Sequence, residues 1–90
     1  MPFEWDETKR RSNIEKHGFD FIDVQEIFDG RPRIESESSR GNEQRHLSLA
    51  MLGGKLVAVV WTLRETEVVR IISARRARNA EERQYSQLYG

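Results

Sequence analysis

The alternation of apolar and polar residues predicts three consecutive β-strands in the second half of the chain. Residues 44–52 alternate, residues 56–63 are apolar at nearly every position, and residues 68–74 return to a strand pattern. Gly53-Gly54 predicts a two-residue hairpin turn, and Glu65-Thr66 permits a second tight turn. Because a strand that is apolar on both faces is normally covered on both, we expect residues 56–63 to be the central strand of an antiparallel meander.

Helical spacing predicts two helices before these strands and one after them. The first runs from about residue 6 or 8 to residue 17 and ends at Gly18, since glycine tolerates the left-handed conformation past a helix end. The second begins at Asp20 as N-cap and reaches about residue 28. The third begins near Asn79, where Asn79 as N-cap and Glu82 three residues later form a capping pattern.

Two further segments complete the predicted order of elements. Residues 3–5 alternate and predict a short first strand, and a strand is expected near residues 33–37. The polar stretch that follows, with Ser38, Ser39, Gly41 and Asn42, is typical of a mobile surface loop. The order is therefore β-α-α-β-β-β-β-α in one domain, residues 1–90. We expect an α+β fold with a small antiparallel sheet, the two N-terminal helices on one face and the C-terminal helix on the other.

Composition narrows the class of protein. The chain has 90 residues and no cysteine, which excludes a disulfide scaffold, a thiolate metal site and a thiol nucleophile. It has neither an apolar run of about 18 residues nor a signal-peptide pattern, so we expect a cytoplasmic protein without membrane contact. Lys+Arg and Asp+Glu are 15 each, and twelve of the basic residues are arginine, whose planar fork binds phosphate in two places.

The residues that could carry chemistry form a set without metal or cofactor. His17 and His46 lie far apart in sequence, so a metal site is not favoured. The candidates are Lys9, Asn13 and Lys16 at helical spacing, His17 beside them, Glu43 and Arg45 on one strand face, Arg64, Arg70, and the cluster Arg75, Arg76 and Arg78. RNA cleavage can use such a set, because the 2′-hydroxyl is the nucleophile and the protein need only move protons and stabilise charge.

Each candidate also has a plainer interpretation. The lysine stripe can be a solvated helix face, His17 can interact with a helix C-terminus, and Glu43 with Arg45 can be a surface ion pair of little value. The arginine cluster can bind a partner protein or lie at a solvated edge. Arg70 lies among apolar strand residues, where an unpaired charge is costly. We therefore expect Arg70 to have a carboxylate partner or to reach a groove.

An ordered set of short motifs resembles the BrnT toxin family. The opening matches W-D-x-x-K-x-x-x-N-x-x-K-H-G, and the second helix resembles its F-x-x-A-x-x-V-F element. Further matches are Glu43-Gln44-Arg45, the strand end at residues 70–77, and residues 82–85. The chain differs from the family pattern at Leu63 and Glu65, where an acidic residue and a glycine are frequent. It also has His46 in place of an aromatic residue and Ala50 in place of glycine.

The resemblance implies a RelE-like fold and a metal-independent endoribonuclease toxin of a type II toxin–antitoxin pair. It also implies a BrnA-like, DNA-binding antitoxin that neutralises the toxin and brings it to operator DNA. On this hypothesis Glu43 or His17 exchanges protons, and Arg45, Arg64, Arg70 and Arg75 hold phosphate charge. Lys9, Asn13, Lys16, Arg76 and Arg78 would contact the RNA. The alternative is a non-catalytic module that binds RNA or a partner, either a co-repressor or a degenerate toxin.

Overall fold

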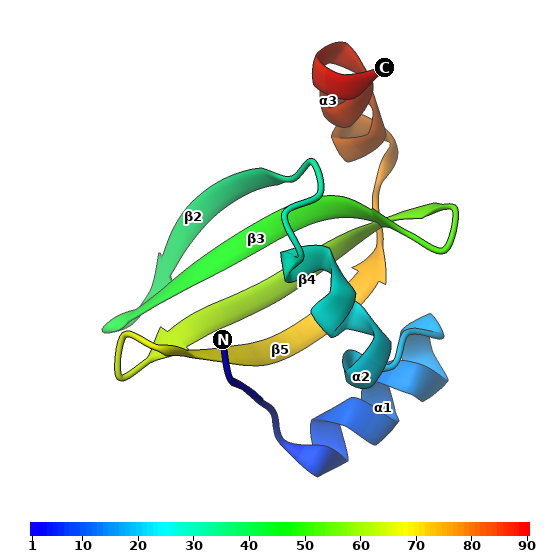
Figure 1. The fold of residues 1–90 in the computed structure, drawn as a ribbon. Helices are drawn as coiled ribbons and strands as arrows, with labels where there is room; N and C mark the ends of the chain where they lie inside the picture. The colour runs from blue at the N-terminus through cyan, green and yellow to red at the C-terminus, as the bar shows by residue number, and fades with distance from the viewer.

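One five-stranded sheet organises the chain, and its strand order is β1-β5-β4-β3-β2. The computed structural model describes residues 1–90, except that the side chain of residue 40 lies outside the description. The strands are β1 (Phe3–Glu4), β2 (Ile34–Arg40), β3 (Glu43–Leu52), β4 (Lys55–Arg64) and β5 (Val68–Arg76). Strands β2 to β5 form an antiparallel meander, whereas β1 joins the edge of β5 in parallel. The predicted element order is confirmed, and β4 is the central strand, as expected (Figure 1).

The helices begin and end close to the predicted residues. Helix α1 (Glu7–His17) is capped by the Asp6 carboxylate and ends at Gly18, whose φ is +75°. The predicted second helix is two short pieces, α2 (Phe21–Val24) and the 3-10 turn η1 (Gln25–Phe28), and the Asp20 carboxylate accepts from the Ile22 N–H. Helix α3 (Asn79–Tyr89) closes the chain. None of the described helices is long and apolar enough to cross a bilayer.

Two local predictions were wrong by a few residues. Ser38 and Ser39 belong to β2, where they pair with Arg45 and Gln44, so the expected loop shrinks to a turn at Gly41. Polar residues suit β2 because it is an edge strand, and its pairing with β3 supplies the hydrogen bonds. The N-cap of α3 is Arg78 rather than Asn79, and the Glu81 carboxylate accepts from the Arg78 N–H at 2.8 Å.

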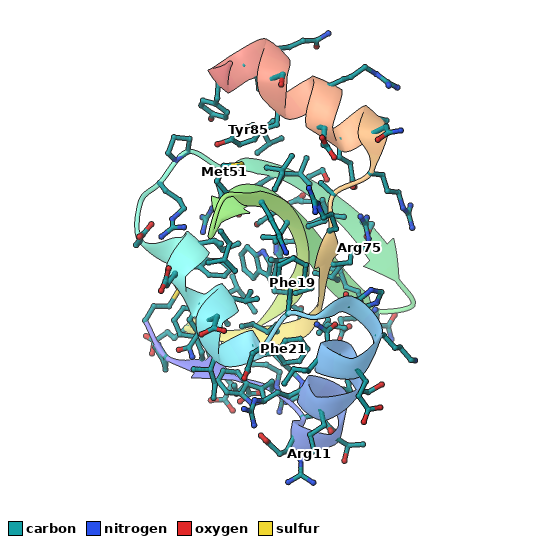
Figure 2. All side chains as sticks on the ribbon, turned by 90° about the vertical axis from the view of Figure 1, so that its right-hand side faces the viewer. Arg11, Phe19, Phe21, Met51, Arg75 and Tyr85 are labelled. Carbon is teal, nitrogen blue, oxygen red and sulfur yellow. The ribbon has the colours of Figure 1, made fainter. Side chains whose placement is uncertain are left out.

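The core lies on both faces of the sheet, as a doubly apolar central strand requires. On one face α2 and η1 contribute Phe21, Val24 and Ile27, which pack on Val57, Val59, Trp61 and Ile71. On the other face Leu49, Leu56, Ala58 and Ala77 pack with Tyr85 of α3. Figure 2 shows Tyr85 beneath α3, toward the sheet, and Phe21 between the N-terminal helices and the strands. The N-terminal helices and α3 therefore cover opposite faces.

At one end of the sheet, β3 and β4 separate. Their ladder runs from the Leu52–Lys55 pair to the His46–Trp61 pair, and the β4–β5 ladder has a bulge at Val60 and Trp61. Beyond that pair the Thr62 hydroxyl donates to the Gln44 carbonyl at 2.8 Å. Bulges often lie beside functional sites because they redirect strands and side chains. We call this region the splayed end; it comprises residues 42–46, at the start of β3, and residues 61–64, at the end of β4.

Candidate active site

Three predicted arginines lie on one face of the sheet at the splayed end. His46, Trp61 and Ile71 pair across β3, β4 and β5, and Trp61 and Ile71 belong to the core beneath the N-terminal helices. Because strand side chains alternate, their neighbours Arg45, Thr62 and Arg70 point to the opposite face, as Arg64 does. We call this side of the sheet the open face. The arginine side chains keep exposed fractions of 26% (Arg45), 54% (Arg64) and 30% (Arg70).

Carboxylates accompany these arginines at hydrogen-bond distance. Arg45 Nε lies 2.8 Å from Glu43 Oε1, which is the pair that their spacing predicted. Arg70 Nη1 lies 2.7 Å from Glu4 Oε2, and Arg64 Nη1 lies 3.5 Å from the same oxygen. We expected Arg70 to have a carboxylate partner or to reach a groove, and Glu4 is such a partner. Sequence reasoning did not identify Glu4, because only the parallel pairing of β1 with β5 places it opposite Arg70.

A pocket of about 550 Å³ opens between the separating strands. It is lined by Asn42, Glu43, Gln44, His46, Thr62, Leu63 and Arg64. The structure thus brings the predicted residues Glu43 and Arg64 together in one pocket. His46, which we set aside as a metal ligand, also lines this pocket; its ring stacks on Trp61 with 4.4 Å between centroids. Its Nδ1 lies 3.6 Å from Glu37 Oε1 of β2, a partner revealed only by the β2–β3 register.

Arg75 lies apart from the other arginines, at the end of the open face that α3 covers. It pairs with Ala58, four β4 positions from Thr62, and its two terminal nitrogens contact both oxygens of Glu81 at 2.8 and 3.0 Å. These hydrogen bonds lower the pKa of the Glu81 carboxyl and raise that of Arg75. Because both terminal nitrogens and both carboxylate oxygens are engaged, we assign Arg75 a structural role that anchors α3.

The arginine run at the end of β5 does not form a single patch. Arg76 pairs with Val57, whose side chain belongs to the core beneath the N-terminal helices, so alternation sends Arg75 and Arg76 to opposite faces. Arg78 lies beyond the strand as the N-cap of α3. Both Arg76 and Arg78 are exposed, but neither lies at the splayed end.

The predicted polar stripe on α1 has two different roles. Asn13 is 6% exposed, and its amide nitrogen donates to the carbonyls of Phe19 and Ala74 at 2.9 and 2.8 Å. Its oxygen accepts from the Ala74 N–H at 3.0 Å. Both amide hydrogens are therefore used to hold α1 against β5. A buried amide must satisfy its hydrogen bonds within the protein, so the structure shows a packing role for Asn13 beside the RNA contact that the sequence predicted.

The other members of the α1 stripe remain accessible. Lys9, Lys16 and His17 line a second pocket, of about 250 Å³, with Ile72 and Ser73 of β5. Ser73 pairs with Val60, which places it on the open face between Arg70 and Arg75. The lysines and His17 therefore border the open face, but His17 does not line the pocket that contains Glu43 and Arg64.

The splayed end offers the groups that RNA cleavage through the 2′-hydroxyl requires. Guanidinium groups can hold two phosphate oxygens each and stabilise the charge that develops on phosphorus. Adjacent carboxylates can accept a proton from the attacking hydroxyl. Arg45, Arg64 and Arg70 at the splayed end are partly or fully exposed, so a polynucleotide can approach them without rearrangement of the core.

Two comparisons with known proteins gave matches. Residues 5–81 match the family model described as "Ribonuclease toxin, BrnT, of type II toxin-antitoxin system". The fold is similar to the crystal structure of the ribonuclease toxin BrnT of Brucella abortus, with a TM-score of 0.68 and 31% sequence identity. The match covers 88% of this chain and 99% of that one. The search of curated proteins gave no match.

Proposed function

The chain belongs to the BrnT family of ribonuclease toxins of type II toxin–antitoxin systems, and from that premise we propose that it cleaves RNA at the open face without a metal ion. The observation that carries the proposal is the position of Arg45, Arg64 and Arg70. They come from three adjacent strands, share one face and stay accessible. Convergent guanidinium groups supply the positive charge that a divalent cation supplies in metal-dependent nucleases.

The proposed reaction is an internal transfer at phosphorus. The RNA 2′-oxygen forms a bond to the adjacent phosphorus, the bond from phosphorus to the 5′-oxygen breaks, and a 2′,3′-cyclic phosphate and a 5′-hydroxyl result. A carboxylate at the splayed end takes the 2′-hydroxyl proton, and Glu43 is the candidate that the sequence identified there. The arginines hold the phosphate, and Lys9 and Lys16 bind the RNA backbone beside it.

RNA cleavage in the presence of a chelator tests this function. Purified protein incubated with total bacterial RNA and excess EDTA should yield fragments with 5′-hydroxyl ends, detectable by kinase labelling. The matched control is Arg64→Ala with Arg70→Ala in one chain, which should bind and cleave far less while folding normally by circular dichroism. Loss of all wild-type cleavage on chelation, with recovery on adding Mg²⁺, would contradict the metal-independent mechanism.

As a type II toxin, the protein has a cognate antitoxin as its partner and RNA as its substrate. We propose that the antitoxin is a BrnA-like DNA-binding protein, that the pair acts in the cytoplasm, and that the toxin reaches operator DNA only through it. Co-expression with the neighbouring reading frame should relieve growth arrest, and the purified pair should retard operator DNA. A toxin that retards the same DNA alone would contradict this arrangement.

A non-catalytic function is the second candidate, because the predicted catalytic arginines already have carboxylate partners. A co-repressor would use these paired arginines only to contact other proteins. However, exposed ion pairs contribute little free energy, and an RNA phosphate can displace them. Growth arrest that persists when Arg45, Arg64 and Arg70 are all replaced by alanine would favour the non-catalytic module.

A further inference from the structure

The Glu4 carboxylate stands between two guanidinium groups of the open face. Arg70 Nη1 and Arg64 Nη1 both contact its Oε2, at 2.7 and 3.5 Å. Among the side chains that the structure describes, no hydrogen-bond donor reaches its other oxygen, Oε1. A phosphate held by these two arginines must therefore lie next to a carboxylate oxygen that is free to accept a proton.

Attachment of β1 does not depend on this carboxylate. The Val69 N–H donates to the Pro2 carbonyl at 3.0 Å, which fixes β1 on the edge of β5. On either side of Glu4, the Phe3 ring packs on Phe28 at 5.4 Å and the Trp5 ring on Phe21 at 6.3 Å. Because apolar contacts hold both neighbours, the partly exposed ion pair of Glu4 adds little to folding.

The Glu4 position also differs from those of the other proton-transfer candidates. Glu43 contacts one guanidinium, that of Arg45, so a phosphate between Arg64 and Arg70 lies nearer to Glu4. His46 stacks on Trp61 on the opposite side of the sheet, and His17 lines a different pocket. Glu4 contacts both arginines that are proposed to hold the phosphate, Arg64 and Arg70.

We infer that Glu4 is a catalytic residue that accepts the 2′-hydroxyl proton, an inference that rests on the proposed ribonuclease function. In this step the 2′-hydroxyl proton moves to Glu4 Oε1 as the 2′-oxygen bonds to phosphorus. The 5′-oxygen leaves with a proton from water, and Glu4 then releases its proton to solvent. Arg64 and Arg70 retain free N–H groups for the phosphate, since a guanidinium has five.

Carboxylate variants test the inference with total bacterial RNA in EDTA. Glu4→Gln should lower the cleavage rate by about 100- to 10,000-fold, the range for loss of a general base. The matched control is Glu67→Gln, an exposed carboxylate in the β4–β5 turn, which should stay within about two-fold of the wild type because it lies outside the site.

Two further measurements separate catalysis from structure. The melting temperature of Glu4→Gln should fall by less than about 5 °C, since an exposed ion pair contributes under about 1 kcal/mol. Added formate should restore part of the activity of Glu4→Ala, because it can occupy the vacated carboxylate position. Full activity of Glu4→Gln, or lost activity with a large melting shift and no formate rescue, would overturn the inference. If Glu43→Gln loses activity while Glu4→Gln does not, the proposed function stands and this inference fails. An inactive wild type overturns both.

Discussion

The two ends of the open face carry the same pair of residue types in different surroundings. At the splayed end Arg70 meets Glu4 through one nitrogen, and both side chains are about one-third exposed. Under α3, Arg75 meets Glu81 through two nitrogens, and both side chains are less than one-fifth exposed. An arginine–carboxylate pair therefore does not mark a site by itself. The number of free N–H groups and the cover above the pair decide whether it can bind a substrate.

The covering element explains the difference. Tyr85 of α3 packs over Leu49, Leu56 and Ala58, so the apolar strand residues beneath α3 are buried. At the other end β3 and β4 separate, and none of the residues that line the pocket there belongs to a helix, which leaves the polar side chains accessible. One sheet face is thus buried at one end and accessible at the other.

Of the two arginines compared, Arg70 should show the larger effect when it is replaced by alanine, and that effect is on catalysis. Removal of this guanidinium should lower RNA cleavage by about 100- to 1,000-fold, the usual cost of losing a group that stabilises developing charge. The melting temperature should change little because the pair is partly exposed and weakly stabilising. Cleavage rates in EDTA and thermal unfolding on the same preparations check this. A variant that is fully active would mean that the splayed end is not the site.

Arg75→Ala should have a smaller effect, and it should lower stability rather than the cleavage rate. The free energy of unfolding should fall by about 1 to 3 kcal/mol, because the partly buried Glu81 carboxylate loses its main hydrogen-bond donor. Cleavage per folded molecule should stay near the wild-type rate. Urea unfolding and initial rates measure the two quantities. If Arg75→Ala instead abolishes cleavage in a stable protein, Arg75 is a catalytic residue as its sequence cluster suggested.

The smallest expected effect is a change in the acid sensitivity of folding. The Arg75 guanidinium lowers the pKa of Glu81 below its usual value of 4.5. The ionised carboxylate therefore stabilises the fold fully above about pH 4.5, and this contribution disappears as the pH falls through the lowered pKa. Glu81→Gln should be less stable than the wild type at pH 7, and the difference should shrink below pH 4.5. Unfolding curves measured across this range check the sign, and a constant difference would contradict it.

Local patterns in the sequence predicted most of the elements. Asp6 and Gly18 bound α1, and the apolar run of β4 placed it at the sheet centre, because caps and side-chain alternation act within a few residues. The Glu43–Arg45 pair followed from strand spacing alone. Ser38 and Ser39 were misplaced because an exposed edge strand has the composition of a loop.

The sequence alone could not assign roles to residues whose partners lie far away along the chain. Asn13 was grouped with two lysines by helical spacing, but burial against Ala74 gives it a structural role. Arg75 was grouped with its arginine neighbours, although its partner comes from α3. In each case spacing defined the face, and packing decided whether that face meets solvent.

By itself the sequence determined the order of the elements, the central strand, the family motifs and the need of Arg70 for either a carboxylate partner or a groove. Only the tertiary structure decided which carboxylate, since Glu4 reaches Arg70 through the parallel register of β1 with β5 across 66 residues. It also decided which arginines share an accessible face. The physical reason is that side-chain periodicity and helix capping depend on residues close together in the sequence. Register, burial and ion pairing depend on segments that meet only in the folded chain.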